Sequence, residues 1–125
     1  MVQVETSQLT GECNSWRENL RQYRDEFSKD KIKLQDAVSQ PLSKAQLQDV
    51  EHLHNQFHIQ LINIHDLKHV IKAHEQRISY EMRVNDGKLN AETLAHHENL
   101  LDQYQSLDST LLELREEFDH FLSRT

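Results

Sequence analysis

Residues 39–47 read SQPLSKAQL and mark the end of one helix and the beginning of the next. Pro41 cannot donate the backbone hydrogen bond that a continuing helix needs, and it disfavours helical backbone angles at Gln40. Ser43, followed three residues later by Gln46, matches a capping box, in which the two side chains satisfy free backbone N–H groups. This stretch therefore predicts a chain reversal between two helices.

We expect helices over residues 9–38 and 44–85, because apolar side chains recur at steps of three and four on both sides of this reversal. A second turn signal, NDGKLN, follows at residues 85–90, where Gly87 can adopt the left-handed angles of a helix end. A third apolar run with regular alternation of steps of four and three predicts a helix over residues 91–123.

Short connections place consecutive helices antiparallel. The sequence therefore predicts an all-α fold: an up-down-up bundle of three long, coiled-coil-like helices that forms a single domain over residues 1–125. The layout is similar to that of a spectrin repeat, including a tryptophan, Trp16, in the first helix. The resemblance is one of architecture, and it implies a fold and no activity. Two glycines and one proline are few for a β-rich fold or a phosphate-binding loop.

The composition argues against several classes of function. The formal net charge is −7, and an acidic chain repels nucleic-acid backbones, so we expect no nucleic-acid partner. The one cysteine, Cys13, cannot form an internal disulfide, and we expect it to be a small buried hydrophobe. No apolar run reaches membrane-spanning length, so we expect no membrane association and a soluble cytoplasmic protein. We also expect no enzyme, cofactor or small-molecule substrate, because no catalytic constellation is evident.

Histidines are concentrated in the helix expected over residues 44–85. On a helical wheel, His54, His58, His65 and His69 form one stripe within an arc of roughly 60°. An i,i+4 pair of histidines can bind zinc, but the two pairs are about 10 Å apart, so one ion cannot use all four. We predict no metal site, and these four histidines are the candidates if one exists. A pH switch is a further alternative.

The remaining histidines give no convergent ligand set on the sequence evidence. We expect His96 and His97 to lie level with the far end of the middle helix, near Tyr80. We expect His120 to face solvent, because it lies opposite the apolar face of its helix. The helix expected over residues 9–38 contains no histidine.

A second, thinner apolar stripe runs along the back of the middle helix, at roughly 80–160° on the same wheel. We call it the outer stripe, and its members are Ile59, Ile62, Val70, Ala73, Tyr80 and Val84. A three-helix monomer would leave these side chains in water, and repeated apolar patches often mark contact surfaces. We therefore predict a non-enzymatic helical interaction or structural module that acts through protein–protein contacts, with the outer stripe as the interface of a homodimer or of a complex with a partner protein. The alternative is a metal-binding bundle that uses the histidines of the middle helix.

Overall fold

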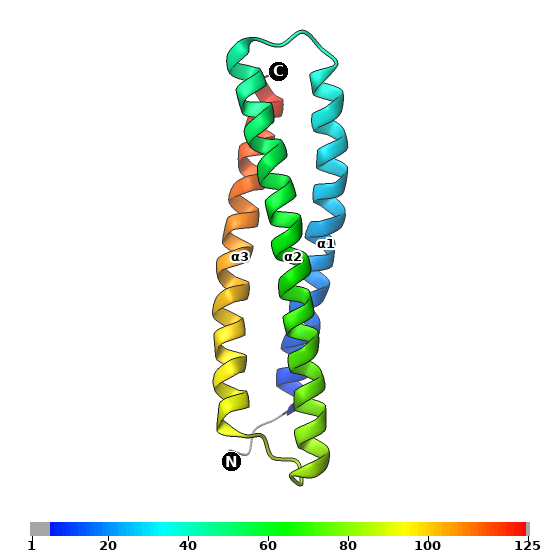
Figure 1. Ribbon diagram of the computed structural model, residues 1–125, viewed down its shortest axis with the longest axis vertical. Coiled ribbons are helices and arrows are strands. Elements are labelled where there is room, and N and C mark those ends of the chain that lie inside the picture. The colour runs from blue at the N-terminus through cyan, green and yellow to red at the C-terminus, as the bar shows by residue number, and fades with distance from the viewer. Residues whose placement is uncertain (1–5, 125) are drawn as a thin grey trace.

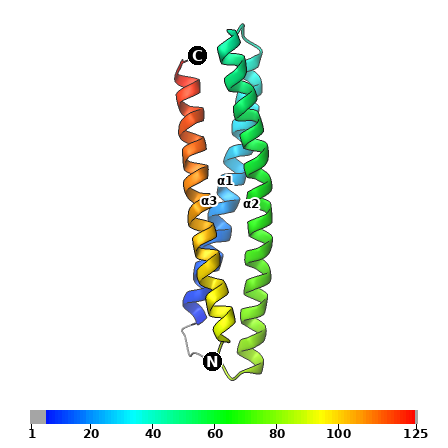
Figure 2. The ribbon, with the colours of Figure 1, turned by 60° about the vertical axis from the view of Figure 1, so that its left-hand side comes forward.

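The computed structural model describes residues 6–124, which form three long helices. The helices are α1 (Thr6–Val38), α2 (Lys44–Val84) and α3 (Ala91–Arg124). They lie side by side and alternate in direction, so that the start of α1 lies at the same end as the α2–α3 turn (Figures 1 and 2). The predicted all-α, up-down-up three-helix bundle is confirmed. Residues 1–5 and 125 of the expected single domain lie outside the described part of the chain.

The capping box at the start of α2 is confirmed. The Ser43 hydroxyl accepts a hydrogen bond from the Gln46 backbone N–H at 3.2 Å, and the Gln46 side-chain oxygen accepts one from the Ser43 N–H at 2.9 Å. At the other end of α2, Gly87 has a φ of +81° and Asp86 a φ of +52°, so the left-handed turn expected at the glycine is also present. The two reversals are thus fixed by local chemistry.

The start of α3 is held to α2 by one buried carboxylate. Glu81 accepts hydrogen bonds from the Asn90 backbone N–H at 2.8 Å, from the Thr93 hydroxyl at 2.5 Å and from Arg77 Nε at 2.8 Å. Burial raises the pKa of Glu81, but these hydrogen bonds outweigh burial and hold the pKa below its ordinary value. The carboxylate therefore remains charged and sets the register between the two helices.

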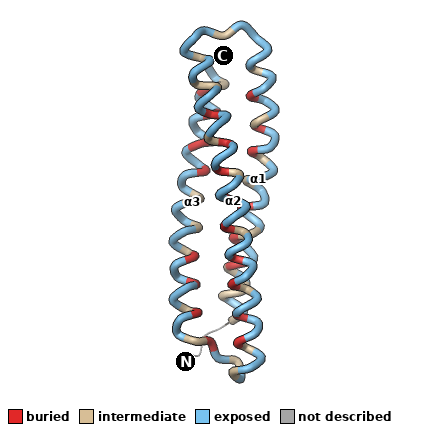
Figure 3. Tube along the Cα trace, viewed as in Figure 1, coloured by how far each residue is buried: buried red, intermediate tan, exposed pale blue. Residues whose placement is uncertain are grey.

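The core is a narrow column between the helices, and buried positions recur along each helix at steps of three and four (Figure 3). α2 packs closely against both neighbours, whereas α1 and α3 make few close backbone approaches. Among residues 6–124, no helix is both long enough and apolar enough to cross a membrane.

Apolar residues and buried positions do not coincide throughout the bundle. Val38 and Leu47, next to the first reversal, continue the apolar spacing of their helices, but each is 45% exposed. Polar residues instead occupy six buried positions along the core: Asp30, Gln60, His74, Glu81, Thr93 and His97. When these polar residues are counted, the spacing of buried positions along the helices is more regular than the spacing of the apolar residues alone.

Candidate functional site

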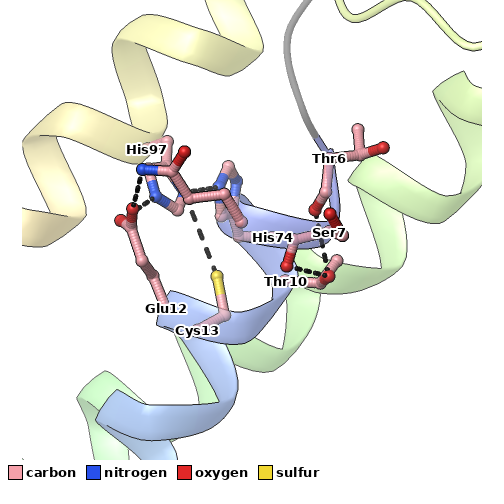
Figure 4. A network of polar contacts seen from close by, with 8 residues as sticks. Thr6, Ser7, Thr10, Glu12, Cys13, His74 and His97 are labelled. Atoms are coloured by element: carbon pink, nitrogen blue, oxygen red, sulfur yellow. Dashed lines mark hydrogen bonds and ion pairs between the residues drawn. The ribbon is translucent and has the colours of Figure 1, made fainter.

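The structure brings together three buried side chains, one from each helix, near the α2–α3 turn. We call Cys13, His74 and His97 the Cys–His cluster (Figure 4). Their candidate ligand atoms all lie within 4.8 Å of one another. His74 Nε2 is 3.0 Å from His97 Nδ1, which in turn is 3.9 Å from Cys13 Sγ. The three side chains are 0–5% exposed.

His97 is positioned by neighbours on α1. Its Nε2 lies 2.9 Å from a carboxylate oxygen of Glu12. Its ring packs against the indole of Trp16, with a centroid distance of 5.0 Å, and Trp16 itself stacks on Tyr104. Since the Glu12 carboxylate accepts a hydrogen bond, Nε2 carries the proton in neutral His97. Nδ1 is then unprotonated, and its lone pair faces the cluster.

His74 is incompletely hydrogen-bonded. Its Nε2 donates to the lone pair on His97 Nδ1, whereas its Nδ1 is buried and has no hydrogen-bond partner in the described part of the chain. Burial, together with the smaller effects of His97 and His96, lowers the pKa of His74 to about 4. The imidazole is therefore neutral at physiological pH, which is the form that binds metal ions.

Cys13 is buried, as expected. Burial, together with the smaller effects of the carboxylates of Glu75 and Glu12, raises the pKa of its thiol to about 12. Without a bound cation the side chain is thus a neutral thiol. Glu75 is itself paired with Arg17, through contacts of 2.5 and 3.1 Å.

The histidines singled out in the sequence lie elsewhere. His54, His58, His65 and His69 are all exposed on α2. The rings of His65 and His69 contact each other, with centroids 4.4 Å apart. Within residues 6–124, the potential metal ligands that lie close enough together to hold an ion are those of the Cys–His cluster. None of these four histidines belongs to it.

The expectation that His97 lies near Tyr80 is wrong, because His97 contacts His74, six residues earlier in α2. The reason is the register at the second turn, where Glu81 holds both Asn90 and Thr93. A sequence signal for the cluster did exist. Steps of three and four through the buried residues of α2 fall on His74, and the same steps from Leu100 toward the start of α3 fall on His97.

The outer stripe forms a second candidate surface. Its five larger members are 40–57% exposed, and Ala73 is exposed as well. Along one flank the stripe borders an open groove of about 670 Å³ between α2 and α3, in which Asp66 and Val70 of α2 face Asn99 and Asp102 of α3. This groove is lined mainly by amide, hydroxyl and carboxylate side chains.

Comparisons with known proteins identify no relative of this chain. No protein-family model matches it. No curated protein and no solved structure matches it either.

Proposed function

We propose that this protein is a self-associating helical interaction module and that the outer stripe is the interface of its homodimer. The observation that carries the proposal is a row of half-exposed apolar side chains, extending from Ile59 to Val84, on the face of α2 that α1 and α3 leave uncovered. At 1.5 Å per residue this row is about 37 Å long. Monomeric proteins seldom leave so extended an apolar row in water.

The order of residues in the outer stripe favours a second copy of the same chain as the partner. In an antiparallel pair of helices related by a two-fold axis, residues equidistant from the axis face each other. With the axis near Ile71, Ile59 lies opposite Val84 of the second copy, Ile62 opposite Tyr80, and Val70 opposite Ala73. In these three pairs, apolar side chains meet apolar side chains.

Charge on the same face also favours the antiparallel arrangement. Asp66 and Arg77 fall within the angular range of the outer stripe, at roughly 120° and 140° on the wheel. They are equidistant from the proposed axis, so each Asp66 would face an Arg77 of the second copy. Arg77 Nε is bound to Glu81, and its remaining N–H groups can donate to a further carboxylate. A parallel dimer would instead place like charges together.

The expected affinity is moderate. A fully buried aliphatic side chain contributes about 1.5–3 kcal/mol, and these side chains are already about half covered in the monomer. The remaining gain is opposed by an association cost of about 4–15 kcal/mol. We therefore expect a dimer with a dissociation constant in the micromolar range.

The dimer can be tested by light scattering and sedimentation over a range of protein concentrations. We expect wild-type protein to dimerise reversibly, and the double variant Ile62→Glu with Val70→Glu to remain a folded monomer. Leu112→Glu is a matched control, since Leu112 is 49% exposed but lies on α3. Wild-type protein that stays monomeric at high concentration would overturn the proposal.

A charge variant tests the register separately. Asp66→Arg should weaken the dimer, because it places two cations opposite each other across the interface. Adding Arg77→Gln should recover part of the affinity, since the repulsion is removed while an amide remains near Glu81. If Arg77→Gln gives no recovery in the Asp66→Arg background, the proposed register is wrong even if a dimer forms.

A further inference from the structure

We propose that the Cys–His cluster binds one divalent transition-metal ion, with Zn²⁺ as the best fit, and that the ion joins all three helices. This site is independent of the outer stripe, because it is buried at the end of the bundle near the α2–α3 turn. It is also separate from the exposed histidines of α2. One thiol and two imidazoles form a ligand set that suits zinc, with a fourth position left for solvent, as in sites that have three protein ligands.

The distances in the cluster approach those of a zinc site. Tetrahedral geometry with Zn–N and Zn–S bonds of about 2.05 and 2.3 Å places two nitrogens about 3.3 Å apart and nitrogen and sulfur about 3.6 Å apart. His74 Nε2 and His97 Nδ1 are 3.0 Å apart, and His97 Nδ1 and Cys13 Sγ are 3.9 Å apart. These two distances differ from the tetrahedral values by about 0.3 Å each, and the ligand atoms of Cys13 and His74 lie within 4.8 Å of each other.

Glu12 occupies the position of an outer partner to a metal-binding histidine. Such histidines usually donate their second ring N–H to a carboxylate, which fixes the tautomer and makes the ligating nitrogen more basic. Glu12 accepts from His97 Nε2 and leaves Nδ1 directed at His74 and Cys13. If His97 served only for packing, a neutral acceptor would be enough for the hydrogen bond of its ring N–H, and a carboxylate would not be needed.

The charges around the cluster favour a dication. The carboxylates of Glu75 and Glu12 disfavour the thiolate of Cys13, and this effect exceeds the opposite effect of Arg17, which is paired with Glu75. Zn²⁺ would reverse this effect, since it stabilises a thiolate directly and attracts both carboxylates. On binding, the S–H bond of Cys13 is broken, an S–Zn bond forms, and the thiol proton is released to solvent. His74 frees its Nε2 lone pair by moving its single ring proton to Nδ1.

The site is also costly as a purely structural feature. A buried polar atom without a hydrogen-bond partner destabilises a protein, and His74 Nδ1 is such an atom within residues 6–124. A leucine at the same core position would avoid the cost. The exposed His96 contacts the ring of His74 at a centroid distance of 5.0 Å and lies between the cluster and solvent.

The test uses the full chain after removal of bound metal with a chelator. Zn²⁺ is titrated in competition with a chromophoric chelator, and Co²⁺ is titrated as a spectroscopic probe. We expect one ion per chain, a higher melting temperature with Zn²⁺, and a cobalt spectrum with thiolate charge-transfer absorption and tetrahedral d–d bands. A cobalt spectrum without a thiolate band would overturn the proposal, and this measurement needs no variant.

Variants then assign the ligands. Glu12→Gln should weaken Zn²⁺ binding by about 10–100-fold, as loss of an outer partner does, and Cys13→Ser should weaken it more. The matched control is His65→Gln with His69→Gln, which removes an exposed histidine pair of α2 and should leave the affinity unchanged. Circular dichroism checks that each variant is folded. Zinc binding that is unchanged in Cys13→Ser but lost in the control would place the ion on the surface pair and refute the cluster.

Discussion

Two triads, each with one residue from every helix, fill the core of this bundle in opposite ways. In the half near the α1–α2 turn, Phe27, Phe57 and Phe118 are 0–1% exposed, and the ring centroids of Phe57 lie 5.3 and 5.2 Å from those of its two partners. In the half near the α2–α3 turn, the second triad is the Cys–His cluster. Both triads are buried to a similar degree, but the first consists entirely of apolar rings, whereas the second contains two imidazoles that lose hydrogen bonds to water on burial.

Burial of a side chain in this core and its contribution to stability are separate properties. The phenylalanines contribute through apolar area and edge-to-face ring contacts. The Cys–His cluster, together with Glu81 and Thr93 nearby, needs hydrogen bonds to offset the cost of burial, and one nitrogen of His74 lacks its partner in the described chain. Stability should therefore be concentrated in the aromatic half, and ligand chemistry in the polar half.

The largest effect should come from the aromatic triad. Phe57→Ala removes the ring that contacts both other phenylalanines, and we expect a loss of about 3–5 kcal/mol in the free energy of unfolding. Denaturation in urea, followed by circular dichroism, measures this loss. Leu112→Ala, at a half-exposed position, should change stability by no more than about 0.5 kcal/mol. Similar losses in the two variants would mean that the aromatic triad is not the stabilising centre.

A smaller loss is expected where the polar half is fully hydrogen-bonded. Glu81→Gln removes the charge that accepts from Asn90, Thr93 and Arg77, and it should cost about 1–3 kcal/mol. The control is Glu98→Gln on α3, an exposed position, which should be close to neutral. If both substitutions are neutral in urea denaturation, Glu81 does not anchor the start of α3.

Acid should affect the polar half through the same carboxylate. The pKa of Glu81 is lower in the folded protein than its ordinary value of 4.5. Its stabilising contribution is therefore complete above that value and is lost as the pH falls through the lower folded pKa. Asp30 acts in the opposite sense, because burial raises its pKa. Comparing acid denaturation of wild type with Glu81→Gln isolates the first effect, and we expect a shallower loss of stability in the variant. Identical acid profiles would contradict the prediction.

The smallest effect, and the one of opposite sign, is expected in the Cys–His cluster. Replacing both His74 and His97 with leucine in metal-free protein should raise the free energy of unfolding by about 1 kcal/mol, since apolar side chains need no partner there. The same double variant should no longer bind Zn²⁺. A large destabilisation would mean that the histidines are kept for packing and hydrogen bonding. His65→Gln with His69→Gln controls for the loss of two exposed histidines.

The three helices and their two reversals follow from local features of the sequence. Pro41, the Ser43 capping box and Gly87 act on backbone angles and on hydrogen bonds within a few residues, so their consequences could be predicted from local chemistry. The exposed position of Ile62 and the other outer-stripe residues also followed from helical periodicity, because three helices can cover only part of the surface of α2.

Only the tertiary structure decided which polar residues meet in the core. Steps of three and four place His74 and His97 on buried faces, but they do not say which residues of two helices lie at the same level. That level depends on the length of the turn and on the contact between Glu81 and Thr93 across it. A shift of one helical turn, about 5.4 Å, would separate His97 from both His74 and Cys13. The cluster therefore exists because of a register between helices, and local sequence patterns do not contain that register.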